Sequence, residues 1–220
     1  MEIINYDTLL EKYVGIAFEK QYNLAEIIGE SDWNIDLNTG NISFGSLSFP
    51  SQILGTYSFD SGTWLWAWAN EASDIPSNLL SEAQALKKLG EENNIEFLSM
   101  AEYKMESTDV HSLGLIASGY FGSSAYYAGN FGSGILLITL KDDSIDSVSY
   151  NEHLRILSVF PEIVKNFTVN HKRSLINYLN TKGYKINENN KKLTAEKGEN
   201  KLSADFDDLG RLISINGEVK

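Results

Sequence analysis

The sequence predicts an α+β protein in which strands and helices occupy separate stretches of the chain. Two observations lead to this: apolar residues alternate with a period of two between residues 31 and 70, and stretches with helical apolar spacing lie on both sides. We expect a four-strand meander and a later hairpin to form an antiparallel sheet packed with helices. A small C-terminal module of one helix and a β-meander follows.

Length and composition limit the class of protein. A chain of 220 residues with 42% hydrophobic content suffices for one domain, or for a domain with an appendage. The sequence has no cysteine, which excludes disulfide scaffolds, thiolate zinc sites and cysteine nucleophiles. The first seven residues are acidic and lack the features of a signal peptide. We therefore expect a cytoplasmic protein.

One uncharged segment, from Leu113 to Leu140, exceeds the roughly 20 residues that a membrane-spanning helix needs. It holds six glycines, four serines and Asn130, so it would insert poorly. A short helix followed by a hairpin uses these glycines better. No membrane association is expected.

The charge is unevenly distributed along the chain. The net charge is -12, of which residues 1–168 carry -15 and residues 169–220 carry +3. This change, with the change in pattern, predicts an acidic core domain over 1–168 and a basic C-terminal helix and β-meander module over 169–220. An acidic core disfavours nucleic-acid binding. It suits a basic protein partner, although solubility is the commoner reason for such a charge.

The first helix is expected over residues 8–28. Thr8 and Glu11 have the spacing of a capping box, and Gly29 is a natural C-terminal stop. Glu19, with its neighbours Lys20 and Gln21, is interpreted as part of the solvated face. Half-buried strands are then expected at 31–37, 42–45, 50–59 and 63–70.

The remaining elements follow from caps, turns and periodicity. A helix is expected to open at Pro76 and to end between Gly90 and Asn94, and residues 95–107 are ambiguous. The later expected elements are a helix opened by Thr108 or Asp109, a hairpin of 124–130 with 134–140, a helix opened by a capping box at 149–152 and kinked or divided at Pro161, a basic helix ending at Gly183, and strands near 184–188, 192–197 and 201–215, the last folded at 207–210.

Three tryptophans at every second position dominate the stretch 63–70. In an extended strand, Trp64, Trp66, Trp68 and Asn70 share one face. One interpretation places the indoles in a core. The other makes them the floor of an open cleft that stacks on a sugar, base or peptide, with Asn70 as the polar anchor. The first is favoured because tryptophan is costly to expose.

A second aromatic concentration includes Tyr126 and Tyr127, interleaved with glycine. If these tyrosines flank the tryptophan strand, the two clusters form one aromatic wall. The glycine-rich run 129–134 lacks dinucleotide and P-loop spacing, so a hairpin turn is the better interpretation. The ligand-binding candidates are therefore Trp64, Trp66, Trp68, Asn70, Tyr126 and Tyr127.

No catalytic or metal-binding motif stands out. His111, His153 and His171 have neither HExxH nor HxH spacing, and each opens a predicted helix, where a solvated or capping role suffices. There is no GxSxG, so catalytic residues stay unassigned, and we expect neither metal nor cofactor. Asp207 and Arg211 are placed to pair across a tight turn.

The tryptophan strand also carries a resemblance. The sequence is similar to a bacterial family of unknown function with a Trp-x-Trp-Ala-Trp-Ala-Asn strand, over roughly residues 5–165 on this pattern. The resemblance implies a cytoplasmic bacterial protein and brings no activity with it. The matching segments are Asp32-Trp33-x-x-Asp36-Leu37, Ile42-x-Phe44-Gly45, Gln52-Ile53-Leu54-Gly55-Thr56 and Thr63-Trp64-Leu65-Trp66-Ala67-Trp68-Ala69-Asn70.

The function expected from these observations is non-enzymatic binding, in particular an immunity-like or antitoxin-like role against a basic protein. The alternative is a small-ligand-binding or hydrolytic enzyme with a pocket near the tryptophan strand and Asn70. A third class, the structural subunit of an oligomer, requires a large exposed apolar patch at the sheet edge.

Overall fold

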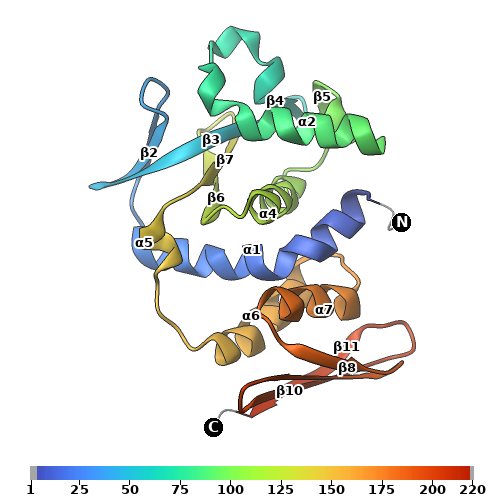
Figure 1. The fold of residues 1–220 in the computed structure, drawn as a ribbon. Helices are drawn as coiled ribbons and strands as arrows, with labels where there is room; N and C mark the ends of the chain where they lie inside the picture. The colour runs from blue at the N-terminus through green and yellow to red at the C-terminus, as the bar shows by residue number, and fades with distance from the viewer. Residues whose placement is uncertain (1–3, 219–220) are drawn as a thin grey trace.

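The computed structural model describes residues 4–218 and confirms the α+β class, with two antiparallel sheets and helices packed against each (Figure 1). The helix α1 lies between the larger sheet with α4 and the pair α6 and α7, which carry the smaller sheet. The helices are α1 (Tyr6–Ile28), α2 (Ser81–Asn93), α3 (Glu96–Ser99), α4 (Asp109–Phe121), α5 (Asp143–Asp146), α6 (Glu152–Asn166) and α7 (His171–Thr181).

The larger sheet has seven strands and contains the expected meander and hairpin. The meander runs β1-β2-β3-β4 and continues into β5, and the hairpin of β6 and β7 joins it by pairing β7 with β3. The helix α2 packs on β3, and α4 packs on β6 and β7. The strands are β1 (Trp33–Asp36), β2 (Asn41–Phe44), β3 (Leu47–Ser58), β4 (Thr63–Trp66), β5 (Glu102–Lys104), β6 (Ala125–Asn130) and β7 (Gly134–Leu140).

The predicted strand 63–70 is too long. Strand β4 ends at Trp66, and residues Ala67–Ala69 form the 3-10 turn η1, closed by the bond from Asn70 N to Ala67 O. The reason lies in the partner strand. Pairing between β3 and β4 ends at Gly55↔Trp66, next to an irregularity of β3 at Leu54, so the chain beyond Trp66 has no backbone partner in the sheet.

Three helices begin later or earlier than their predicted caps. Asn5 caps α1 and exchanges bonds with Thr8, so the capping box lies three residues before the predicted one. A 3-10 turn occupies 77–79 before α2 begins at Ser81, and Asn151 rather than Ser149 caps α6. Pro161 does not divide α6, which is a single helix.

The smaller sheet confirms the predicted C-terminal meander. Its order is β11-β10-β9-β8, and its inner face is apolar and packs toward α6 and α7. At the predicted turn, Arg211 Nε lies 2.7 Å from Asp207 Oδ2. The predicted boundary at 168/169 falls between α6 and α7. The strands are β8 (Lys185–Glu188), β9 (Lys192–Lys197), β10 (Asn200–Phe206) and β11 (Leu212–Glu218).

Helix α1 joins the two parts through buried polar contacts. The prediction of Glu19 as solvated is wrong, because its side chain is fully buried. It accepts hydrogen bonds from Tyr150 and Tyr178 and forms an ion pair with Lys182. One turn earlier, the ring of Tyr178 leaves no room for a Cβ on Gly15, which brings α1 and α7 close together.

The uncharged segment 113–140 is divided among α4, β6 and β7. Within residues 4–218, no helix combines the length and apolar character required to cross a bilayer.

Candidate functional site

Trp64 and Trp66 lie in the core. Both are 0% exposed, and their rings meet edge to face with centroids 5.5 Å apart. A Cβ on Gly55 would lie 2.4 Å from the carbonyl of Leu65 and 2.5 Å from the Trp64 ring, so glycine is required for this packing. The two indoles therefore present no open face for stacking on a ligand.

Trp68 and Asn70 leave this face because the chain turns after Trp66. The ring of Trp68 is half-buried, and Lys87 Nζ of α2 lies 4.3 Å from its centroid. Asn70 is also half-buried, and its side chain has no hydrogen-bond partner anywhere in residues 4–218. The predicted polar anchor is thus neither on the face of Trp64 and Trp66 nor held by a hydrogen bond from the described residues.

Tyr126 and Tyr127 do not reach the tryptophan strand, because β7 and β3 separate β6 from β4. The Tyr126 hydroxyl lies 3.2 Å from His111 Nδ1, and burial raises the pKa of Tyr126. The Tyr127 ring instead contacts Phe44 and Trp33. The two aromatic clusters do not form one wall.

The histidines have different surroundings. His153 is buried, contrary to the prediction, and its Nδ1 lies 2.9 Å from the Tyr184 hydroxyl. His171 Nδ1 accepts a hydrogen bond from Leu212 N. Across the described chain, no three His, Asp or Glu side chains are placed to hold a metal ion together.

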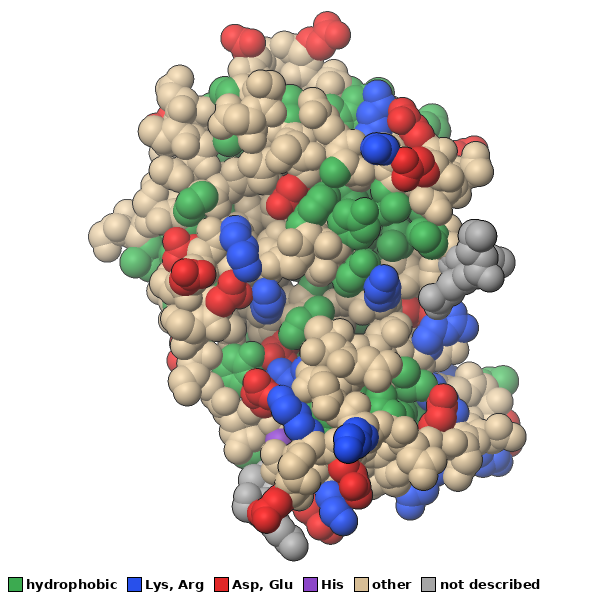
Figure 2. Space-filling view, in the orientation of Figure 1, with side chains coloured by type: hydrophobic (Ala, Val, Ile, Leu, Met, Phe, Trp, Pro, Cys, Tyr) green, Lys and Arg blue, Asp and Glu red, His purple; other side chains and the backbone are tan. Residues whose placement is uncertain are grey.

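An open apolar groove lies where α3, β5 and the first residues of α1 and α4 meet. Its volume is about 300 Å³. Figure 2 shows apolar side chains gathered in this region, below the end of α2 and beside the start of α1. The lining residues are Tyr6, Phe97, Tyr103, Met105, Asp109 and Leu113.

Three rings form a row along this groove. The ring centroids of Tyr6 and Phe97 are 5.1 Å apart, and those of Phe97 and Tyr103 are 6.4 Å apart, both edge to face. Leu113 is fully buried beneath them, whereas the three rings and Met105 are half-buried. Half-buried aromatic and methionine side chains are typical of binding surfaces.

Two tryptophans of β4 hold the aromatic residues of this groove in place from the core side. Trp66 Nε1 donates a 2.9 Å hydrogen bond to the carbonyl of Phe97, and Trp64 pairs with Tyr103 across β4 and β5. At the far side, Asp109 Oδ2 accepts a bond from Glu106 N and fixes the start of α4. The core indoles thus support the groove without lining it.

The border of the groove is acidic. Residues 91–109 carry six acidic side chains and one basic side chain, Lys104. Five carboxylates lie on the groove or on the elements beside it, and none of them forms an ion pair with any residue from 4 to 218. These residues are Asp7, Glu96, Glu102, Glu106 and Asp109.

A second hollow of about 280 Å³ adjoins the first and shares Tyr6 and Asp109 with it. It is more polar and reaches the end of α6 at Asn166. Burial raises the pKa of Tyr6, and the charges of Asp109 and Asp7 raise it further. A hydrogen bond with Ser112 lowers it in part. Both carboxylates therefore raise the pKa of a tyrosine that lines the two hollows.

The sequence pattern missed this groove. Its central residues, 95–107, fold into one turn of helix and a three-residue strand, which are too short to show a period. The concentration of acidic residues between 91 and 109 was the available signal.

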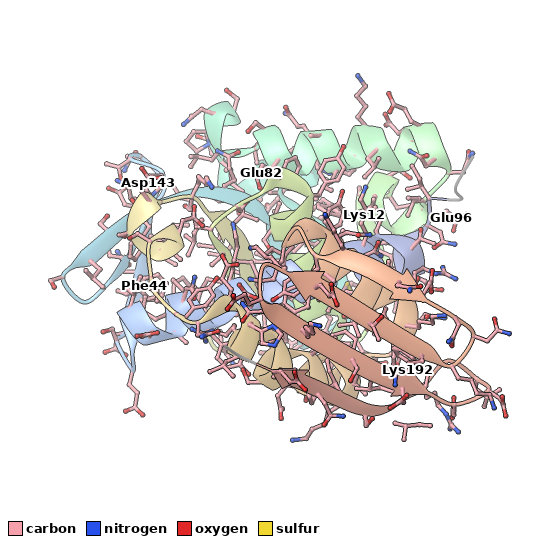
Figure 3. All side chains as sticks on the ribbon, turned by 60° about the horizontal axis from the view of Figure 1, so that its bottom comes forward. Lys12, Phe44, Glu82, Glu96, Asp143 and Lys192 are labelled. Carbon is pink, nitrogen blue, oxygen red and sulfur yellow. The ribbon has the colours of Figure 1, made fainter. Side chains whose placement is uncertain are left out.

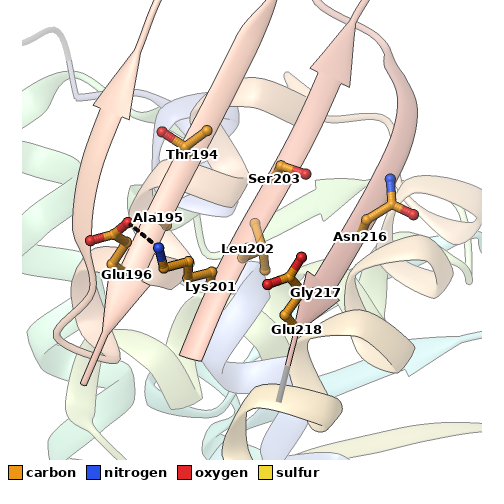
Figure 4. Close-up of a pocket in the computed structure, with 9 residues that line it drawn as sticks. All are labelled: Thr194, Ala195, Glu196, Lys201, Leu202, Ser203, Asn216, Gly217 and Glu218. Carbon is orange, nitrogen blue, oxygen red and sulfur yellow. Dashed lines mark ion pairs between the residues drawn. The ribbon is translucent and has the colours of Figure 1, made fainter. Parts of the chain in front are cut away.

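The smaller sheet has a shallow trough on its outer face (Figure 4). Glu196 and Lys201 form an ion pair across it at 3.6 Å, and Thr194, Ser203 and Asn216 supply neutral polar groups. Most cations of residues 169–218 form ion pairs. The trough itself is lined by Lys201, Glu196 and Glu218, so it has no surplus of positive charge. The paired cations are Lys172, Arg173, Lys182, Lys191, Lys197, Lys201 and Arg211.

Comparison with curated proteins and with solved structures finds no match. A family model does match, over residues 7–142, which span α1 to β7 and include the tryptophan strand and most of the groove. The chain therefore belongs to a family of unknown function, DUF6882.

Proposed function

We propose that this chain is a non-enzymatic, cytoplasmic bacterial binding protein whose groove receives a basic protein partner. The observation that carries this proposal is the coincidence of an apolar groove with five carboxylates that have no ion-pair partner among the described residues. Glu19 and Glu152, by contrast, are paired within the chain. Glu26 and Glu30, like the groove carboxylates, have no ion-pair partner among residues 4–218, but they do not lie beside this apolar groove.

The two features have separate roles in binding. The row of Tyr6, Phe97 and Tyr103 supplies apolar area that an anchor side chain of the partner covers, and such central anchors carry most of the affinity. The acidic border accelerates the encounter with a basic partner and disfavours acidic ones. An immunity-like or antitoxin-like role is the specific form of binding that this charge suits.

The alternative of a pocket on the tryptophan strand has less support. Trp64 and Trp66 are enclosed, and the Asn70 side chain forms no hydrogen bond with residues 4–218. Binding is also supported by the lack of a recognisable catalytic motif in the sequence.

The test is a selection of random displayed peptides on the full chain at physiological ionic strength. We expect the enriched peptides to combine lysine or arginine with a large apolar residue. A parallel selection uses a Glu102→Gln/Glu106→Gln variant, which removes two exposed border charges. Its matched control is Glu26→Gln/Glu30→Gln, which removes two exposed charges at the other end of α1.

The border variant should lose the enrichment of basic peptides, and the control variant should keep it. The proposal would be contradicted if the native chain selected neutral or acidic peptides. It would also be contradicted if the border and control variants enriched basic peptides equally.

A further inference from the structure

We propose that the second hollow is a subsite for a cationic side chain of the partner, next to the apolar anchor that fills the first hollow. This inference rests on the proposed function and adds the chemistry of the segment that binds. The segment carries an arginine or lysine adjacent to a large apolar residue.

The first support is continuity. The two hollows are of similar size, about 300 and 280 Å³, and Tyr6 and Asp109 line both. Two neighbouring side chains of one peptide can therefore enter them together. The first hollow is lined by rings, Met105 and Leu113, whereas the second adds the polar groups of Thr108, Ser112, Asn166 and Thr168.

The second support is charge. Asp7 and Asp109 line the second hollow, and neither forms an ion pair with a residue from 4 to 218. Tyr6 lines both hollows, and burial together with the charges of Asp109 and Asp7 raises its pKa. Among residues 4–218, no lysine or arginine lines this hollow.

The third support is the helix α6. Its 15 residues end at Asn166, on the border of the second hollow, and the chain then runs on through Phe167 and Thr168. The last carbonyl groups of a helix are free of intrahelical partners and carry partial negative charge. The end of α6 therefore brings partial negative charge to this border. A cation at this position also has the Tyr6 ring beside it.

The occupant is therefore a peptide segment and not a free metal ion. A metal ion would use the carboxylates and leave the row of rings uncovered, whereas an apolar residue joined to a cationic one matches both hollows. The two hollows have different roles. The first, apolar hollow supplies most of the affinity, and the second, acidic hollow selects a peptide with a basic residue next to the apolar one.

The probe is the blocked dipeptide N-acetyl-Trp-Arg-amide, compared with the same dipeptide containing citrulline, which keeps the shape of arginine and removes its charge. Binding is followed by the ¹³C-methyl signal of Met105, assigned from a Met105→Leu variant. The sequence has only three methionines, so the spectrum is simple.

We expect N-acetyl-Trp-Arg-amide to shift the Met105 signal and to bind about fivefold more tightly than the citrulline peptide, the size of effect typical of partly exposed charge pairs. In the Asp7→Asn/Asp109→Asn variant this preference should disappear, while the new amide at position 109 still offers an oxygen to the start of α4. The control Asp143→Asn removes an exposed charge on the opposite side of the molecule from Glu96 (Figure 3) and should retain the preference.

The outcomes separate the two proposals. If both peptides shift Met105 with equal affinity, the cationic subsite is contradicted and the apolar groove stands. If neither peptide shifts Met105, both proposals are contradicted. A preference for arginine that survives in the Asp7→Asn/Asp109→Asn variant also overturns the subsite.

Discussion

Lys182 Nζ lies 2.7 and 3.0 Å from the two carboxylate oxygens of Glu19, although these residues are 163 positions apart in the chain. The Glu19 side chain is fully buried, and that of Lys182 is 5% exposed. Tyr150 and Tyr178 donate to the same carboxylate; burial raises the pKa of both phenols, and the contact with Glu19 raises it further. The pair connects α1 to the end of α7.

Replacing Glu19 by glutamine is expected to destabilise the protein by about 3–5 kcal/mol, because it leaves the buried Lys182 charge without a partner. Urea unfolding measures the loss. The control is Glu162→Gln, which breaks the exposed ion pair with Lys165 and should change stability by at most about 1 kcal/mol. An equal loss in both variants would show that burial of the pair has no effect. A double Glu19→Met/Lys182→Met variant should recover part of the stability.

The core position of Trp64 and Trp66 predicts resistance to acrylamide. Trp33 and Trp68 are half-buried, so a Trp33→Phe/Trp68→Phe variant keeps only the two enclosed indoles. Its fluorescence should be quenched several-fold less in the folded state than after unfolding in urea. Similar quenching in the two states would place these indoles in contact with solvent and would reopen the cleft interpretation.

Glu82 in the first turn of α2 provides a pH test. Burial raises the pKa of Glu82, and a 2.5 Å hydrogen bond from Thr139 lowers it by a smaller amount. When the pKa of an acid is higher in the folded than in the unfolded chain, the folded protein loses stability as the pH rises above the unfolded pKa. For glutamate that pKa is about 4.3. Relative to the native chain, Glu82→Gln should therefore become more stable between pH 4 and pH 7. A difference that stays constant with pH would rule out this shift.

His153 has the opposite dependence on pH. Burial lowers its pKa, so the unfolded chain binds its proton more readily than the folded chain does. The free energy of unfolding should fall as pH decreases below about 6.5, well above the range where carboxylates titrate. A His153→Gln variant should show a shallower fall between pH 7 and pH 5. His111 and His171, whose pKa values burial also lowers, should account for part of what remains. An unchanged slope would contradict the role of His153.

Local patterns predicted most elements because their causes are local. Alternation over residues 31–66 produced the meander, and the glycines of 113–140 divided that stretch into a helix and a hairpin, as in the structure. The preference for Trp64 and Trp66 in the core likewise followed from the cost of exposing indoles.

The errors have non-local causes. Strand β4 ends at Trp66 because β3 becomes irregular near Leu54, which no periodicity in residues 63–70 reveals. Glu19 looked solvated because its donors lie in residues 150–182, far along the chain. The groove was missed because Phe97 and Tyr103 belong to elements of four and three residues.

The central claim is that the groove binds a basic partner, and the most direct measurement compares two matched variants. Met105→Lys places a positive charge inside the groove, and Leu209→Lys places one on an exposed turn of the smaller sheet. The ligand is a basic peptide selected on the native chain, and calorimetry measures its affinity. Met105→Lys should weaken binding at least about tenfold and Leu209→Lys by no more than about twofold, with both variants folded by thermal unfolding. Equal affinity for both variants would contradict binding at this groove.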